Sequence, residues 1–160
     1  IERYTAHLAP DYAVITDPLD RADLKKLGRA IFWESARPYH YLRTTTDHRL
    51  IIGGEDDRVD VPARRDRRVH ERAKLLYAYA QALFPSLTLT PAFAWAGTFA
   101  ETEDGLPFFG PHERVHRRVL FAMGYGGNGI TYSVLGPTLL RALIERESHP
   151  LAALYSFARL

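Results

Sequence analysis

The chain has 160 residues and a mass of 18.2 kDa, which is the size of a single domain. Its apolar fraction of 46% and charged fraction of 25% are typical of a globular protein and exclude a disordered or collagen-like chain. No apolar run approaches the ~18 residues that cross a bilayer, so we expect no membrane segment. The sequence has no cysteine, which excludes disulfides and cysteine-based metal sites and favours a reducing, cytoplasmic compartment.

The first third of the chain predicts short strands joined by tight turns. Residues 13–16 form an apolar strand that ends at an Asp-Pro pair, and residues 22–32 carry a mixed pattern that fits a short helix or a loop. Residues 39–43 and 49–52 alternate like two strands, with residues 46–48 as the hairpin turn between them. Antiparallel pairing is therefore expected here.

Residues 64–84 predict the first long helix. Apolar side chains at spacings of three and four residues share one face of it: Val69, Ala73, Leu76, Ala80 and Leu83. Asp66 is the expected N-cap, and Pro85 ends the helix.

The remaining elements follow in a regular order. Residues 87–99 predict one or two strands, and Asp104-Gly105 predicts a tight turn before residues 106–108. Residues 119–123 are continuously apolar and predict a strand buried on both faces. Residues 130–144 predict a second helix, and an irregular tail begins at Pro150. Strands joined by turns with segregated helices indicate an α+β fold.

A glycine-rich loop lies between that last strand and the second helix. Residues 124–129, Gly-Tyr-Gly-Gly-Asn-Gly, satisfy G-x-G-x-x-G, the dinucleotide-binding pattern. The chain ends soon after the helix, however, without the second strand and acidic residue that a Rossmann unit requires. Free N–H groups at the helix start still favour negative charge, such as that of a reduced flavin ring. The alternative is a plain strand-to-helix turn without a ligand.

Several blocks of the chain resemble the FAD-dependent D-amino-acid oxidase superfamily. Residues 95–110 (WAGTFAETEDGLPFFG) and 121–133 (FAMGYGGNGITYS) are similar to its C-terminal signature. Residues 39–43 and 50–56 resemble its substrate-domain hairpin, and residues 15–19 resemble the strand end before it. The blocks occur in the family's order and cover most of the chain.

This resemblance implies one part of a two-domain flavoenzyme. Residues 1–110 would be the substrate-binding domain with its antiparallel sheet and helices. Residues 111–160 would be the strand, loop and helix by which the chain returns to the FAD-binding domain. The N-terminal Rossmann part, with most of the FAD contacts, is absent from this sequence, so the chain alone is expected to be inactive.

The same resemblance implies which residues contact FAD. These are two groups along the chain: Gly105, Leu106 and Pro107, and then Gly126, Gly127, Asn128, Gly129, Ile130 and Thr131. Binding would be non-covalent as far as this segment shows, because it lacks the cysteine that some relatives use. Oxidation would be hydride transfer from substrate to flavin, for which no catalytic side chain is obligatory.

The predicted substrate pocket departs from that of amino-acid oxidases. Relatives that oxidise amino acids carry a carboxylate-binding arginine at the position of Phe99, and some carry a second one at Gly127. An amine substrate, as in the γ-glutamylputrescine oxidase-like branch, therefore fits better. Tyr39, Tyr41 and Arg43 share one strand face and are the candidate pocket wall. The alternative is that these residues do not bind substrate: the two tyrosines then only cover the sheet, and the arginine is simply exposed.

Other functions have less support from the residues. Five arginines between residues 64 and 72 are interrupted by acidic residues, which indicates a salt-bridged helix surface rather than a nucleic-acid site. His112 and His116 have helical metal-ligand spacing, but no third ligand is evident, so no metal is expected. The rival hypotheses are a small α+β binding or interaction domain without catalysis and an anion-binding module at Gly129. We also expect the isolated chain to form a dimer through its exposed strand edge and apolar surface.

Overall fold

The computed structural model describes residues 6–35, 38–57 and 61–159. The chain divides into two compact units. One is Ala9–Thr98, and the other combines residues 6–8 with residues 99–159. The segment 99–110, expected in the substrate domain, thus belongs to the same unit as the C-terminal helix. None of the helices in the described ranges has the length and apolar character needed to cross a membrane.

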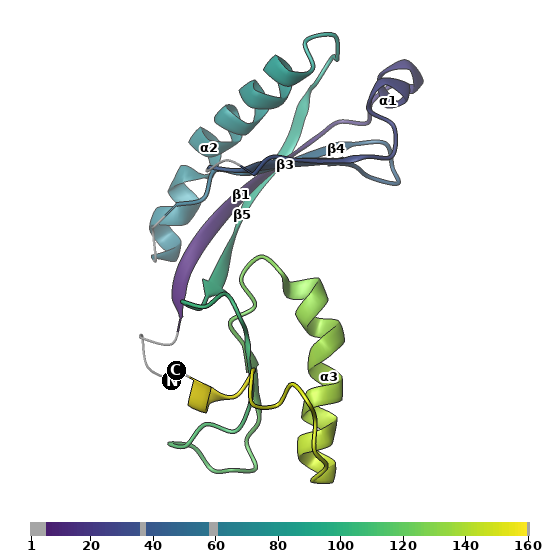
Figure 1. Cartoon of the computed structure of the whole chain (residues 1–160). Coiled ribbons are helices and arrows are strands. Elements are labelled where there is room, and N and C mark those ends of the chain that lie inside the picture. The colour runs from purple at the N-terminus through teal and green to yellow at the C-terminus, as the bar shows by residue number, and fades with distance from the viewer. Residues whose placement is uncertain (1–5, 36–37, 58–60, 160) are drawn as a thin grey trace. The chain divides into compact units, whose positions relative to one another are not determined.

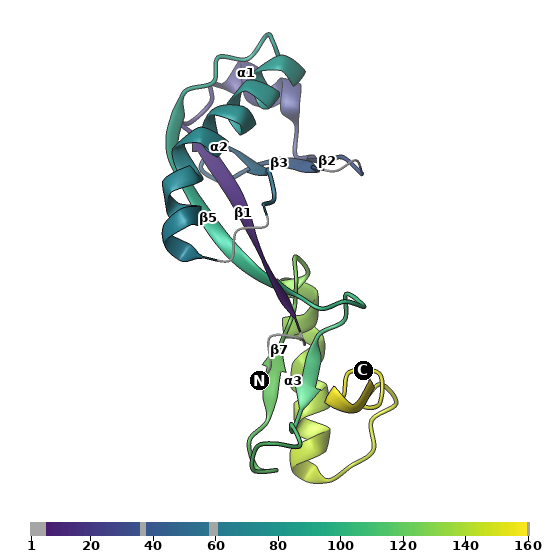
Figure 2. The same ribbon diagram turned by 90° about the vertical axis from the view of Figure 1, so that its left-hand side faces the viewer.

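The first unit is built on a twisted sheet with a helix along one face (Figures 1 and 2). In the described part of the chain the strands of this sheet are β1 (His7–Thr16), β2 (Ile31–Trp33), β3 (His40–Thr44), β4 (Leu50–Gly54) and β5 (Pro91–Glu101), and the first residues of β1 and the last of β5 belong to the second unit. They lie in the order β2-β3-β4-β1-β5, and β4 pairs antiparallel with both β3 and β1. The antiparallel sheet and the hairpin turn at residues 46–48 are confirmed.

Helix α1 (Arg21–Leu27) lies at one end of this sheet (Figure 1). The Asp20 side chain caps it by accepting a hydrogen bond from the Asp23 N–H at 2.7 Å. Gly28, at a φ of 65°, ends the helix and turns the chain into β2. The mixed pattern of residues 22–32 therefore reflects a short helix followed by a strand.

Helix α2 (Pro62–Leu83) covers one face of the sheet, as the apolar spacing predicts. Leu76 and Ala80 are fully buried against strand residues such as Leu42 and Ile52. The spacing also places Leu83 on this face, but its side chain is 47% exposed, because it lies in the last turn, beyond the buried part of the helix.

The predicted N-cap of α2 at Asp66 is wrong. The helix begins earlier, at Pro62, and Val61 occupies the cap position without a side-chain hydrogen bond. Proline suits the first helical position because its missing N–H needs no partner there. Asp66 instead forms an ion pair with Arg65 at 2.7 Å.

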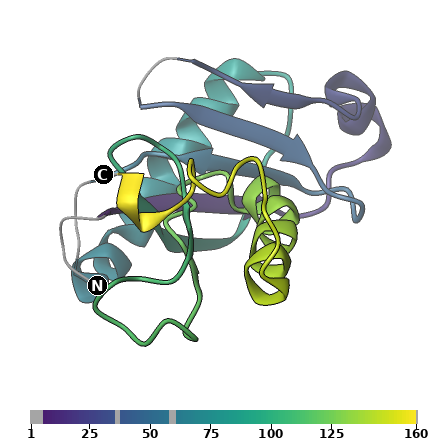
Figure 3. The ribbon, with the colours of Figure 1, turned by 60° about the horizontal axis from the view of Figure 1, so that its bottom comes forward.

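The second unit contains a small strand pair, a long helix and a C-terminal tail. Strands β6 (Phe108–Gly110) and β7 (Phe121–Met123) pair antiparallel, and helix α3 (Gly129–Glu145) packs with β6. Figure 3 shows the tail in yellow, running from α3 to the short 3-10 helix η1 (Phe157–Arg159). Phe109, Leu139 and Tyr155 form the core of this unit.

Strand β7 differs from its prediction. It begins at Phe121, its residues are half-buried or exposed, and Val119 before it is 42% exposed. The apolar run predicts a strand buried on both faces, but β7 belongs to a two-stranded sheet and is therefore an edge strand. The turn at Asp104-Gly105 is confirmed. The strand that follows this turn, β6, pairs with β7.

A glycine in α3 sets how closely that helix approaches β6. A Cβ atom added at Gly136 would lie 2.4 Å from the Phe109 ring. We expect Gly136→Ala to lower the free energy of unfolding by about 1–3 kcal/mol, the usual cost of overpacking. Denaturant unfolding measures this effect. Gly129→Ala is the control, because its Cβ would meet nothing within 4 Å; an equal loss in both variants would contradict the packing explanation.

Candidate functional site

The glycine-rich turn between β7 and α3 needs glycine at two of its positions. Gly124 and Gly126 have φ values of 77° and 53°, which side chains rarely adopt. A Cβ atom at Gly124 would also lie 2.9 Å from the Thr102 methyl carbon. The Gly126 N–H donates to the Ala100 carbonyl at 2.9 Å, which ties the turn to the end of β5.

The start of α3 is open to solvent. Asn128 occupies the N-cap position but makes no capping hydrogen bond through its side chain, and the first turn holds no acidic residue. Gly127, Asn128 and Thr131 are exposed, and Ile130 is 87% exposed. The first-turn N–H groups have no acceptor within the helix, and the helix dipole adds partial positive charge. This arrangement favours an electron-rich ligand atom.

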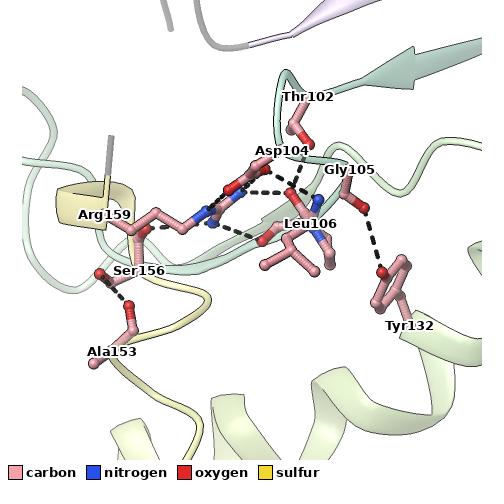
Figure 4. Close-up of polar contacts among 9 residues, drawn as sticks. Thr102, Asp104, Gly105, Leu106, Tyr132, Ala153, Ser156 and Arg159 are labelled. Carbon is pink, nitrogen blue, oxygen red and sulfur yellow. Dashed lines mark hydrogen bonds and ion pairs between the residues drawn. The ribbon is translucent and has the colours of Figure 1, made fainter.

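The second predicted FAD-contacting segment lies beside the first. The Tyr132 hydroxyl, one turn into α3, donates to the Gly105 carbonyl at 3.3 Å (Figure 4). Leu106 packs against the core that includes Leu139 of α3. The structure therefore brings residues 105–107 and the start of α3 together.

Arg159, near the end of the chain, holds the 104–107 loop in place (Figure 4). Its guanidinium binds both carboxylate oxygens of Asp104, at 2.6 and 3.1 Å. It also donates to the carbonyl groups of Leu106 and Pro107 and lies over the Phe108 ring, 3.8 Å from its centroid. Sequence reasoning missed this residue, since a single arginine in an irregular tail has no pattern to reveal its role.

The predicted pocket residues of the hairpin belong to the first unit. Tyr41 lies on the sheet face opposite the one that α2 covers. The residues that pair with it in a row across neighbouring strands are Trp33, Gly53 and Ala13. The Tyr41 ring lies over Gly53, where an added Cβ atom would clash with it at 2.1 Å. Tyr39 lies beside Tyr41, with ring centroids 6.4 Å apart, and Arg43 is exposed.

Tyr41 has an acidic partner that sequence reasoning missed. Its hydroxyl donates to Asp11 Oδ2 at 2.8 Å, and Asp11 is buried in β1. Burial, aided by the nearby negative charge of Asp56, raises the pKa of Asp11 to about 6, despite the hydrogen bond from Tyr41. Burial and the Asp11 charge likewise raise the pKa of Tyr41. This pair places a titratable carboxylate on the predicted pocket face.

Phe99 lies near the end of β5 and is half-buried. It belongs to the second unit, together with the glycine turn and the 104–107 loop, whereas Tyr39, Tyr41 and Arg43 belong to the first. The predicted site residues therefore form two groups, one in each unit.

The other charged candidates have structural roles. Arg68 and Arg72 pair with Asp57, and Arg72 also binds Glu55 at 2.9 Å, as a salt-bridged helix surface requires. The rings of His112 and His116 each accept a backbone N–H two residues further along, at 3.2 Å. Within the described ranges, no group of three histidine or acidic residues is arranged to hold a metal ion.

The Asp104–Arg159 pair makes a pH-dependent contribution to stability. Arg159 holds the pKa of Asp104 well below its ordinary value of 3.8. The contribution is therefore present above about pH 3.8 and is lost as the pH falls through the lowered pKa. We expect Asp104→Asn to lower the free energy of unfolding at pH 7 by about 1 kcal/mol or less and to flatten its decline in acid.

Unfolding measured between pH 2 and pH 7 tests this expectation. The matched control is Glu103→Gln, because Glu103 is exposed and adjacent and has no partner among the described residues. If Glu103→Gln flattened the acid decline as much as Asp104→Asn, the pair would not be its source.

Comparison with known proteins identifies the family. The model of the FAD dependent oxidoreductase (DAO) family matches residues 5–140. Glycine oxidase of Geobacillus kaustophilus (strain HTA426) is 36% identical over 130 residues, which are 79% of this chain and 32% of the relative. The chain thus spans about a third of the length of that relative.

Solved structures share the fold. Glycine oxidase from Geobacillus kaustophilus superposes with a TM-score of 0.73 at 24% identity, over 98% of this chain and 40% of that one. L-proline dehydrogenase from P. horikoshii gives a TM-score of 0.75 at 21% identity, over 98% of this chain and 41% of that one. The antiparallel sheet, the glycine-rich turn and the family match lead to one conclusion: this chain belongs to the DAO family of FAD dependent oxidoreductases.

Proposed function

We propose that this chain is part of an enzyme that oxidises an amine or amino acid by hydride transfer to FAD. The observation that carries the proposal is the uncapped, exposed start of α3 beside the loop fixed by Arg159. Family membership supports the same conclusion. FAD, when bound, supplies the acceptor for the hydride that leaves the carbon next to the substrate nitrogen.

The residues present fit the pyrimidine end of a flavin. Residues 126–131 offer backbone N–H groups and small side chains, and the dipole of α3 favours the negative charge that a flavin gains on reduction. Gly105, Leu106 and Pro107 form the adjoining wall, which Arg159 holds in place. The chain contains no cysteine to form a thioether to the flavin, which supports a non-covalent role in binding FAD.

We propose that the remaining FAD contacts come from a dinucleotide-binding segment outside this chain. Support comes from the length of the relatives, because this chain covers only 32–41% of each of them. The sheet unit would then bind substrate, and residues 111–160 would contribute to the FAD-binding domain. The absence of cysteine supports a reducing, cytoplasmic location.

The substrate that we propose is a small molecule with an amine group. Phe99 occupies the position of the carboxylate-binding arginine, which removes a charge-assisted bidentate contact to an amino acid. On the sheet face, the rings of Tyr39 and Tyr41 offer apolar walls. The Asp11 carboxylate at the Tyr41 hydroxyl offers negative charge to a cationic amine.

Flavin absorbance of the full-length gene product tests the proposal. We expect a yellow protein with bands of oxidised flavin that bleach when an amine substrate is added without oxygen. A protein that stays colourless after reconstitution with FAD would contradict the proposal and favour a binding domain without catalysis.

A substitution at Gly127 tests the assignment of the turn. We expect Gly127→Asp to lower the flavin reduction potential, because a negative charge would oppose that of the reduced ring. A change of about 1.4 kcal/mol corresponds to about 30 mV for this two-electron couple. The neutral control of equal size is Gly127→Asn. Equal potentials in the two variants, measured by dye-coupled reduction, would argue against a flavin at this turn.

We also propose that the isolated 160-residue chain self-associates. Ile31, Trp33 and Phe93 are 73%, 71% and 69% exposed, and their strands β2 and β5 are the two edges of the sheet. Exposed apolar residues and unpaired strand edges favour association. Light scattering is expected to give a dimer mass that Trp33→Asp reduces, whereas Ile130→Asp, in the other unit, leaves it unchanged. A wild-type monomer would refute the proposal.

A further inference from the structure

A cavity of about 740 Å³ lies between the end of α1 and the turn that joins β3 to β4. Its volume falls in the usual range for small-molecule sites, roughly 300–1,000 Å³. All of its lining residues belong to the unit Ala9–Thr98, and none of them is among the residues assigned above to FAD.

The polar lining of this cavity is basic. Lys25 and Arg29 approach from α1 and the loop after it, Arg43 from β3, and His48 from the turn. No aspartate or glutamate is among the described residues that line it. The walls therefore carry three fixed positive charges and a histidine around one concave space.

Among the described residues, the acidic side chains near this cavity form ion pairs with other cations. Lys26 pairs with Asp23 at 2.8 Å, and Arg49 pairs with Asp47 at 3.0 Å and with Asp17 at 3.7 Å. Within the described ranges, Lys25, Arg29 and Arg43 form no ion pair or hydrogen bond through their side chains. Like charges gathered around a concave surface raise the local concentration of anions.

Hydrogen bonds fix the walls before any ligand arrives. The Thr44 hydroxyl donates to the Gly28 carbonyl at 3.3 Å, which ties the end of α1 to the hairpin. The Thr45 hydroxyl accepts the Arg49 N–H at 2.9 Å and closes the turn. Thr46 adds a further hydroxyl to the lining, and Leu24 and Ile31 add apolar surface.

We propose that this cavity binds the carboxylate or phosphate group of a small organic anion. Arginine and lysine bind such groups by charge-assisted hydrogen bonds, and the threonine hydroxyls add neutral donors. The apolar residues fit a short hydrocarbon portion next to the anionic group. Binding at this site does not depend on the flavin proposal. The anion comes either from the distal end of the amine substrate or from a separate molecule.

Calorimetric titration of the full-length protein with glutarate and with inorganic phosphate tests the proposal. At constant ionic strength, we expect the double variant Lys25→Gln/Arg29→Gln to bind glutarate at least tenfold more weakly than wild type. The control is Arg21→Gln, an exposed arginine of α1 outside the cavity lining, which is expected to keep wild-type affinity. Thermal unfolding checks that all variants are folded.

The outcomes separate the two sources of the anion. If the double variant raises KM for amines with a distal carboxylate but not for their amides, the site holds the end of the substrate. If the double variant weakens binding of glutarate or phosphate but leaves these KM values unchanged, the site serves a separate anion. Either of these two results supports the proposal. No binding to wild type, or an equal loss in Arg21→Gln, would overturn it. Because calorimetry needs no turnover, anion binding is measured equally well on an inactive or flavin-free protein.

Discussion

The contact between Arg159 and the 104–107 loop is the interaction on which the candidate site depends. One guanidinium neutralises Asp104 and donates to the Leu106 and Pro107 carbonyls, which lie outside any strand. A loop with a free carboxylate and fewer partners for its carbonyls would adopt many conformations. The contacts of Arg159 restrict the conformations of this loop, so the glycine-rich turn has a fixed neighbour.

The glycine-rich turn is constrained from two sides. Gly124 admits the Thr102 methyl group, and Gly126 hydrogen-bonds to the end of β5, so the strand, the turn and the loop form a continuous backbone framework. The N–H groups at the start of α3 remain outside this framework and are available to a ligand. The backbone of the turn is thus tied down at Gly124 and Gly126, whereas the start of α3 has no side-chain cap. Fixed N–H groups of this kind are the donors that electrostatic stabilisation of a developing charge requires.

Sequence reasoning succeeded where a local pattern determines the structure. The β3–β4 hairpin follows from alternating residues around a short turn, and the buried side of α2 follows from apolar spacing at Leu76 and Ala80. It failed where distant segments meet. The pairing of β6 with β7 joins strands separated by an irregular loop, and Arg159 reaches Asp104 across 55 residues. The Asp11–Tyr41 pair depends on strand order, which no local pattern in either strand encodes.

The absence of a side chain at Gly136 has a consequence beyond packing density. Gly136 lies seven residues after Gly129, which is nearly two full turns and roughly 10 Å along the axis of α3, so both residues lie on the same side of the helix. The Phe109 ring occupies the space that a side chain at this position would fill, so this side of α3 packs directly against β6. The side of the first turns of α3 that faces the Gly105 carbonyl is therefore set in part by an aromatic ring two turns away.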